Sequence, residues 1–185
     1  MPLGAVLAGG AATRLGGAKA TVELAGLPLI AYPLAALSQA AVDHVVVAKA
    51  DSPLPTLDIT VITEPDEPRH PLAGVVAAMS HAGARPVLVV PCDAPFLTSM
   101  LLRVLASAPK TTAVRSDGRV HPLIALYATK DLARLEEAVA NGDSATEAVE
   151  AIDPDWIQAP ERETFNVNTP EDLARAEALL RQPRS

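Results

Sequence analysis

A glycine-rich stretch near the N-terminus carries the residue types that bind phosphate. It spans residues 7–19 and reads Leu-Ala-Gly-Gly-Ala-Ala-Thr-Arg-Leu-Gly-Gly-Ala-Lys, with Arg14 and Lys19 as its two cations. Glycine lets backbone N–H groups approach anionic oxygens, Arg14 can hold a phosphate with its planar fork, and Lys19 adds a point charge. The stretch predicts a cradle for a triphosphate; the alternative is a surface loop with incidental charges.

The spacing within this stretch excludes two common phosphate-binding motifs. Walker A needs Gly-Lys-Ser/Thr, but Lys19 lies between two alanines. The dinucleotide fingerprint needs Gly-x-Gly-x-x-Gly, which glycines at 9, 10, 16 and 17 do not supply. The remaining pattern, Leu-Ala-Gly-Gly-x3-Arg-x-Gly-x2-Lys, resembles the signature loop of nucleotidyltransferases, which join an NTP to a phosphorylated acceptor and release pyrophosphate.

Asp93 is the second residue that points to this chemistry. It follows the strongest apolar stretch of the chain, Pro86–Val90, in a turn between Pro91 and Pro95. Open α/β sheets bind ligands beyond the carboxyl ends of their strands, so we expect Asp93 to face the same crevice as the glycine-rich loop. Mg²⁺ usually takes one or two protein carboxylates besides water and phosphate, and Asp93 is predicted to be its ligand. The alternative for Asp93 is a helix cap.

The elements that must position these residues alternate between strand and helix. Hydrophobic residues make up 49% of the chain and aromatic residues only 3%, as in a Val/Leu-rich parallel sheet covered by Ala-rich helices. We predict a single-domain α/β, Rossmann-like nucleotidyltransferase fold over residues 1–185, with a mostly parallel mixed sheet flanked by helices. The expected strands are 4–8, 43–48, 58–63, 86–90, 111–115, 122–127 and 156–158, and the expected helices are 29–40, 71–82, 98–108, 130–140, 145–151 and 170–181.

Two local signals refine this prediction. The strands 111–115 and 122–127 are so close in sequence that an antiparallel pair is expected within the sheet. Before the last helix, Thr169 is expected to cap, Pro170 to take the first helical position and Asp172 to complete a capping box. Pro71 is expected in the first turn of its helix.

The composition limits the partners and the compartment. The net charge is −7 and the pI about 5.0, which argues against a general nucleic-acid surface. Cys92 is the single cysteine, so no internal disulfide forms, and it is expected to be a small buried residue instead of a catalytic thiol. The uncharged stretch 24–42 is interrupted by glycine and proline and is expected to be a buried helix with its lead-in, not a membrane span. With no targeting signal evident, a cytoplasmic location is expected.

Together with the glycine-rich loop, four further stretches make nearly the whole chain similar to the molybdenum cofactor guanylyltransferase family. These are Pro-Leu-Ala-Gly at 71–74, Pro-Cys-Asp-Ala-Pro at 91–95, His-Pro-Leu-Ile-Ala-Leu-Tyr at 121–127 and Phe-Asn-Val-Asn-Thr-Pro-Glu-Asp-Leu at 165–173. The resemblance implies that the chain transfers GMP from GTP to Mo-molybdopterin with Mg²⁺ in the cytoplasm. It also implies transient contact with other proteins of cofactor biosynthesis.

The resemblance assigns roles to individual residues. Arg14, Lys19 and Asp93 would serve catalysis by alignment and charge neutralisation, with Asp93 as the metal ligand. His121, Asn166 and Asn168 would face the acceptor, or the two asparagines would complete the metal site. The alternatives are a pair of turn residues ahead of a helix for the asparagines and a hydrogen-bonded structural residue for His121. The nucleotide would be bound by Leu7, Ala8, Gly9, Gly10, Lys19, Glu64 and Asp93.

The chain also departs from the family pattern near the expected base site. Ala48 stands where the family often has asparagine, and Glu64 stands where it often has aspartate. A cytidylyltransferase of the same pterin, a transferase with another phosphorylated acceptor and a non-catalytic nucleotide-binding module stay open as alternatives. The cytosine-using relatives tend to read Leu-Ala-Ala-Gly, whereas Gly9 leaves room for a purine near the backbone.

Overall fold

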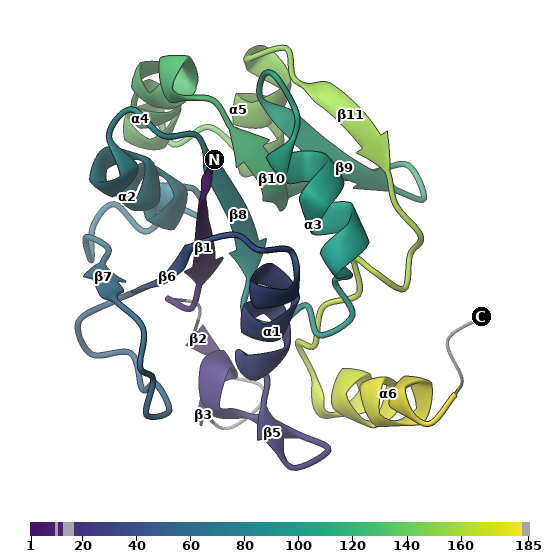
Figure 1. Cartoon of the computed structure of the whole chain (residues 1–185). Coiled ribbons are helices and arrows are strands. Elements are labelled where there is room, and N and C mark those ends of the chain that lie inside the picture. Colours follow the sequence, from purple (N-terminus) through teal and green to yellow (C-terminus); the bar gives the residue numbers. More distant parts are fainter. Residues whose placement is uncertain (10, 13–16, 183–185) are drawn as a thin grey trace.

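The main sheet has seven strands in the order β11-β9-β10-β8-β1-β6-β7 (Figure 1). The computed structural model describes residues 1–9, 11–12 and 17–182, without the side chains of 11, 12, 17 and 18. Within this part of the chain, β10 is antiparallel to β8 and β9, while the other pairings are parallel, as expected for a mostly parallel mixed sheet. Its strands are β1 (Leu3–Leu7), β6 (His44–Ala48), β7 (Val61–Thr63), β8 (Val87–Pro91), β9 (Thr112–Ser116), β10 (Arg119–Tyr127) and β11 (Asp155–Gln158).

Helices cover both faces of this sheet, because successive side chains of a strand point to opposite faces. Val6 of β1 packs in one buried cluster with residues of α1 and α3, whereas its neighbour Ala5 packs in a second cluster with residues of α2, α4 and α5. A third, smaller cluster, which includes Val167 and Ala176, packs α6 against the chain after η1. The helices are α1 (Ala31–Gln39), α2 (Ala73–Ala82), α3 (Ser99–Ala106), α4 (Leu132–Asn141), α5 (Ala145–Ala151) and α6 (Pro170–Leu180), with 3₁₀ turns η1 (Lys19–Thr21) and η2 (Thr129–Asp131).

Two small antiparallel pairs lie below the main sheet in Figure 1. They are β2 (Ala11–Ala12) with β3 (Gly17–Ala18), and β4 (Glu23–Leu24) with β5 (Leu27–Pro28). The β2–β3 pair belongs to the glycine-rich stretch and leads directly into η1. The phosphate-binding candidate residues therefore lie between β1 and a short 3₁₀ turn that carries Lys19.

Several boundaries differ from the expectations for physical reasons. Helix α2 begins at Ala73 and not at Pro71, because the Leu72 N–H donates to Nδ1 of His70 at 3.0 Å and closes a turn before the helix. β10 begins at Arg119 and not at 122, since Asp117 and Gly118 both have positive φ and form a two-residue hairpin turn. The third expected strand, 58–63, forms a ladder only over β7.

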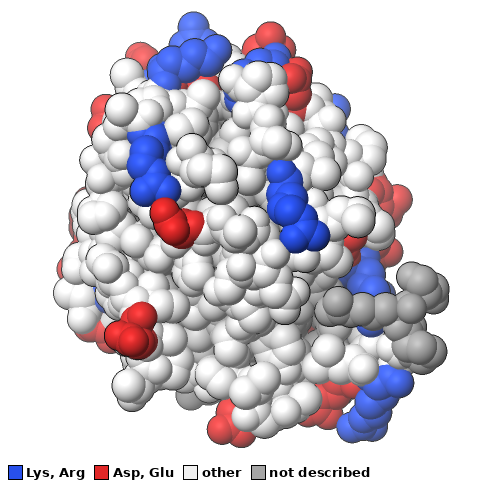
Figure 2. Space-filling model, in the orientation of Figure 1, with Lys and Arg blue, Asp and Glu red and all other residues white. Residues whose placement is uncertain are grey.

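The predicted capping box of α6 and the antiparallel pair β9–β10 are confirmed. The expected buried helix with its lead-in over 24–42 is found as α1, which has four buried residues, preceded by the β4–β5 pair. Among the described helices, none combines the length and the apolar character that crossing a membrane requires. On the face shown in Figure 2, most of the described surface is uncharged, and basic and acidic side chains are scattered over it.

Candidate active site at the carboxyl edge of the sheet

The loops after β1 and β8 meet because these parallel strands end at the same edge of the sheet. The N–H of Ala8 donates to the carbonyl of Val47 in β6 at 2.7 Å, and the N–H of Cys92 donates to the carbonyl of Leu7 at 3.0 Å. These bonds extend the sheet ladders by one residue beyond β1 and β8. The residues that follow, Gly9 and Asp93, are therefore placed by rigid strands and not by free loops.

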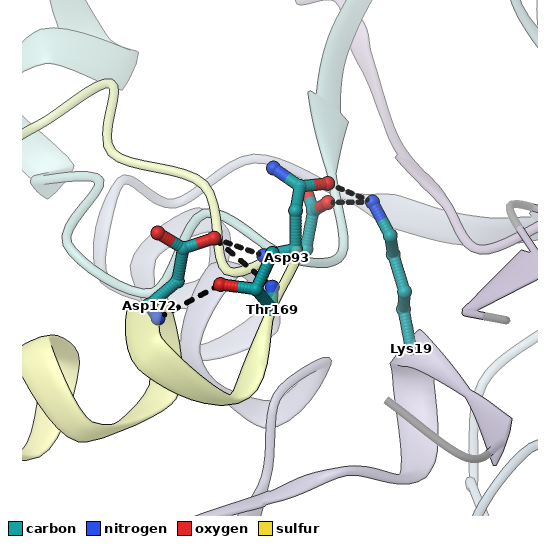
Figure 3. Close-up of polar contacts among 5 residues, drawn as sticks. Lys19, Asp93, Thr169 and Asp172 are labelled. Atoms are coloured by element: carbon teal, nitrogen blue, oxygen red, sulfur yellow. Dashed lines mark hydrogen bonds and ion pairs between the residues drawn. The ribbon is translucent and has the colours of Figure 1, made fainter. Parts of the chain in front are cut away.

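Three polar side chains from distant parts of the chain converge at this edge. Nζ of Lys19 lies 2.5 Å from Oδ2 of Asp93 and donates to Oδ1 of Asn168, also at 2.5 Å (Figure 3 shows Lys19 and Asp93). The Asp93 side chain is only 6% exposed, and that of Lys19 is 19% exposed. A buried carboxylate needs a partner of opposite charge, and Lys19 supplies it here.

The capping box of α6 holds Asn168 in this cluster. The N–H groups of Asn168 and Thr169 both donate to Oδ2 of Asp172 at 3.0 Å, and the Asp172 N–H donates to Oγ1 of Thr169 at 3.1 Å (Figure 3 shows Thr169 and Asp172). One residue earlier, the Val167 N–H donates to the Asp93 carbonyl at 2.9 Å. The start of α6 is thus fastened directly to the loop after β8.

The oxygens at this edge are of the kind that bind Mg²⁺. Asp93 offers a carboxylate and Asn168 an amide oxygen, both in contact with Lys19. Oδ1 of Asn166 is buried and has no hydrogen-bond partner among the described residues. Buried polar atoms are rarely left unpaired, so this orphan oxygen fits a missing ligand atom. Hard oxygen ligands beside one lysine suit a metal-bound phosphate.

Glu64 lies in a narrow space between two glycines, which we call the glycine slot. A side chain on Gly9 would overlap Oε1 of Glu64, and a Cβ on Gly74 would lie 2.6 Å from Oε2. Gly74 is the second residue of α2, so the carboxyl group lies at the positive end of that helix dipole. Glu64 is half-buried, and burial raises the pKa of its carboxyl group.

His121 and Cys92 stand apart from the cluster. His121 lies near the start of β10, which begins at the same edge of the sheet because β10 is antiparallel to β8. Within the described residues, no hydrogen bond or ion pair joins His121 to Lys19, Asp93 or Asn168. Burial, and to a lesser degree Arg119, lowers the pKa of His121. Cys92 is buried and its thiol pKa is raised to about 12, which fits the expected structural role.

The remaining candidate residues have mixed outcomes. Leu7 is the last residue of β1, and Ala8 and Gly9 follow it at the edge described above. Gly10 and Arg14 lie outside the described residues, so their predicted roles stay predictions. Sequence reasoning assigned no role to Lys49 or to Gly74; a cation directly after β6 and a glycine at the start of α2 were the available signals.

A cavity of about 470 Å³ lies behind the glycine slot, between β7, α2 and α4. It borders the slot through Thr63, Pro65 and Ala73, the neighbours of Glu64 and Gly74. The described residues that line it are mostly apolar, with Glu136 as the one charged residue among them. Because this lining includes a carboxylate and no cation, it does not suit a triphosphate.

Solved structures place this fold among the nucleotidyltransferases. Molybdopterin-guanine dinucleotide biosynthesis protein A from Archaeoglobus fulgidus is 25% identical, with a TM-score of 0.77 over 96% of this chain and 98% of that chain. The fold is also similar to that of 2-C-methyl-D-erythritol 4-phosphate cytidylyltransferase from Thermus thermophilus, at 21% identity and a TM-score of 0.73, over 98% of this chain and 100% of that chain.

The sequence gives the narrower assignment. Residues 4–155 match the MobA-like NTP transferase domain. A molybdenum cofactor guanylyltransferase from Rhodobacter capsulatus is 36% identical, over 97% of this chain and 96% of the relative. The chain therefore belongs to the MobA-like NTP transferase family and is an enzyme, a nucleotidyltransferase.

Proposed function

We propose that this enzyme transfers GMP from GTP to Mo-molybdopterin in the cytoplasm and releases pyrophosphate. The observation that carries the proposal is the contact of Lys19 with both Asp93 and Asn168 beside the start of the glycine-rich loop. The similarity to molybdenum cofactor guanylyltransferases over nearly the full chain supports the choice of substrates. We also expect transient contacts with proteins that supply the acceptor or take up the product.

In the proposed reaction, an oxygen of the acceptor phosphate attacks the α-phosphorus of GTP. The bond between the α-phosphorus and the oxygen that bridges to the β-phosphorus breaks, and pyrophosphate leaves with that oxygen. No protein nucleophile is needed, which agrees with a buried Cys92 whose thiol stays protonated. Catalysis then depends on alignment and on neutralising the charge of the phosphates.

Lys19 and Asp93 divide this work. Nζ of Lys19 has three N–H donors and already binds two oxygens, so it can exchange one of them for a phosphate oxygen when GTP binds. Asp93, with Asn166 and Asn168, would hold Mg²⁺. The bound metal would neutralise charge on the triphosphate and on the leaving pyrophosphate. His121 is proposed to face the acceptor, and facing the acceptor is the alternative role for the two asparagines if they are not metal ligands.

Glu64 is proposed to bind the base. Guanine presents two adjacent donors, N1–H and the N2 amino group, which match the two oxygens of one carboxylate. Cytosine and adenine each present one amino donor beside an acceptor nitrogen, which a carboxylate would repel. A charged acceptor in the glycine slot therefore favours guanine, although Ala48 offers no side-chain amide.

Pyrophosphate release measured with GTP, with and without molybdopterin, tests the reaction. Release that depends on the acceptor is expected, whereas binding of GTP without release would favour the non-catalytic module. Competition among equimolar GTP, CTP and ATP tests the base. Incorporation of CTP equal to or above that of GTP would favour a cytidylyltransferase.

A further inference from the structure

Lys49 lies beside Glu64 at the ends of two neighbouring strands. β6 and β7 are parallel, with Ala48 opposite Thr63, so Lys49 and Glu64 are each the first residue after this last pair. The Glu64 N–H donates to the carbonyl of Ala48 at 2.9 Å. The two loops therefore start side by side, one with a cation and the other with a carboxylate.

The ammonium group of Lys49 is held over the loop that carries Glu64. Nζ donates to the backbone carbonyl of Asp66 at 3.1 Å and lies 3.7 Å from Oδ1 of the same residue. The Lys49 side chain is 24% exposed, whereas that of Asp66 is 76% exposed. An ion pair with so exposed a partner contributes little to stability, so its structural effect is to place the ammonium group.

The charged groups that act on Glu64 among the described residues are Lys49 and Asp66. Burial is the largest effect and raises the pKa of the Glu64 carboxyl; Lys49 lowers this pKa, and Asp66 raises it to a lesser degree. From the other elements packed against it, α2 contributes Gly74 and the end of β1 contributes Gly9, neither of which carries a charge. Lys49 is thus the side chain that opposes the effect of burial.

We propose that Lys49 is a positioning residue for the nucleotide: its ammonium group, held by Asp66 at the end of β6, places a positive charge beside the carboxyl group of Glu64 in the glycine slot. The inference rests on the proposed contact between Glu64 and guanine. A protonated Glu64 would lose one acceptor oxygen and present an O–H to the two donors of the base. Ala48 has no polar side chain that could contact the base. The electrostatic support for base binding therefore comes from the next residue, Lys49.

The test compares the pH dependence of GTP binding in two variants that are expected to shift the pKa of Glu64 in opposite directions. GTP affinity is measured between pH 5 and pH 8 by calorimetry without acceptor, and KM and kcat by pyrophosphate release with it. Affinity should fall as the pH falls through the pKa of Glu64. Lys49→Met should move this fall to higher pH and raise KM for GTP increasingly as the pH falls, with about tenfold as the upper limit for a pKa change of one unit, and with kcat within about twofold. Asp66→Asn keeps the backbone carbonyl that accepts from Lys49 and removes a charge that raises the pKa of Glu64, so it should move the fall to lower pH.

Matched controls separate the charge from the fold. Lys49→Arg keeps the charge and should retain the wild-type profile. Lys110→Met breaks another lysine–aspartate pair, with Asp155 at 2.9 Å, and should leave GTP affinity unchanged. In a Glu64→Gln background, which has no titrating group in the slot, Lys49→Met should no longer change the pH dependence.

Two outcomes would overturn the inference. If Lys49→Met gives the wild-type profile, Lys49 plays no part in binding the base. If Lys49→Met and Asp66→Asn weaken GTP binding equally at every pH, Lys49 merely fastens the loop. Failure of the proposed function is seen separately, as wild-type protein that binds GTP with this pH profile but releases no pyrophosphate when the acceptor is added.

Discussion

Replacing Asp93 by asparagine should strongly reduce nucleotidyl transfer while leaving the protein folded. Asparagine keeps the shape of the side chain but removes the charge that Mg²⁺ and Lys19 require. Loss of one group that stabilises charge in the transition state typically costs about 2.7–4 kcal/mol, which corresponds to a roughly 10²- to 10³-fold lower kcat. The effect on stability should be smaller, because Lys19 still donates to Asn168.

The size of the stability effect follows from the bond that is weakened. A hydrogen bond to a charged group contributes about 1.5–3 kcal/mol, and we take the lower end because the amide oxygen of the substituted side chain can still accept from Lys19. For a chain of this size about 1.5 kcal/mol lowers Tm by roughly 3–6 °C. Calorimetric melting and Mg²⁺-dependent pyrophosphate release measure the two effects independently.

Asp155→Asn is the matched control for this prediction. It makes the same substitution in an exposed pair, Lys110–Asp155, on the edge strand β11, and both activity and Tm should stay close to wild type. An Asp93→Asn protein that is folded and keeps Mg²⁺-dependent activity within a fewfold of wild type would refute the metal assignment. A loss of activity that merely follows the unfolded fraction would refute the catalytic role.

Three further substitutions and one alkylation test have distinct expected results. Lys19→Ala should lower kcat by about 10²-fold or more at unchanged KM for the acceptor, by loss of charge stabilisation, and full activity of its folded fraction would contradict this. Gly74→Ala should raise KM for GTP more than it lowers kcat, because the new Cβ would displace Glu64; an unchanged KM would show that the slot does not bind the base. Thr169→Ala should cost about 1 kcal/mol of stability through the lost cap and also lower kcat, since Asn168 is held by the same capping box; a change in Tm alone would separate the two roles. Cys92 should resist iodoacetamide at pH 8 in the native protein and react after unfolding, and rapid native alkylation would contradict a thiol pKa of about 12.

Sequence reasoning succeeded where the signal was local or followed from parallel strands. The convergence of Asp93 with Lys19 was predictable because strands of a parallel sheet end at one edge, and the capping box was predictable from Thr169 and Asp172 alone. The roles of Leu7 to Gly9, Glu64 and the two asparagines came from the family resemblance and stay proposals.

The glycine slot could not be read from the sequence. It depends on three residues, at positions 9, 64 and 74, that approach one another only after β1, β7 and α2 have packed. The contact between Lys49 and Asp66 is equally tertiary, since it depends on the pairing of β6 with β7. The predicted start of α2 was wrong for a local reason. The ring of His70 accepts a hydrogen bond from the Leu72 N–H and closes a turn, so the helix begins two residues after Pro71.

The fastening of α6 to the loop after β8 makes the site depend on the last segment of the chain. The described strands of the main sheet all precede this segment, and the last of them ends at Gln158. Asn168, which accepts from Lys19, is held by Asp172 in the first turn of α6. A chain truncated after Gln158 would therefore keep the residues of every described strand of the main sheet but lack a residue that contacts Lys19.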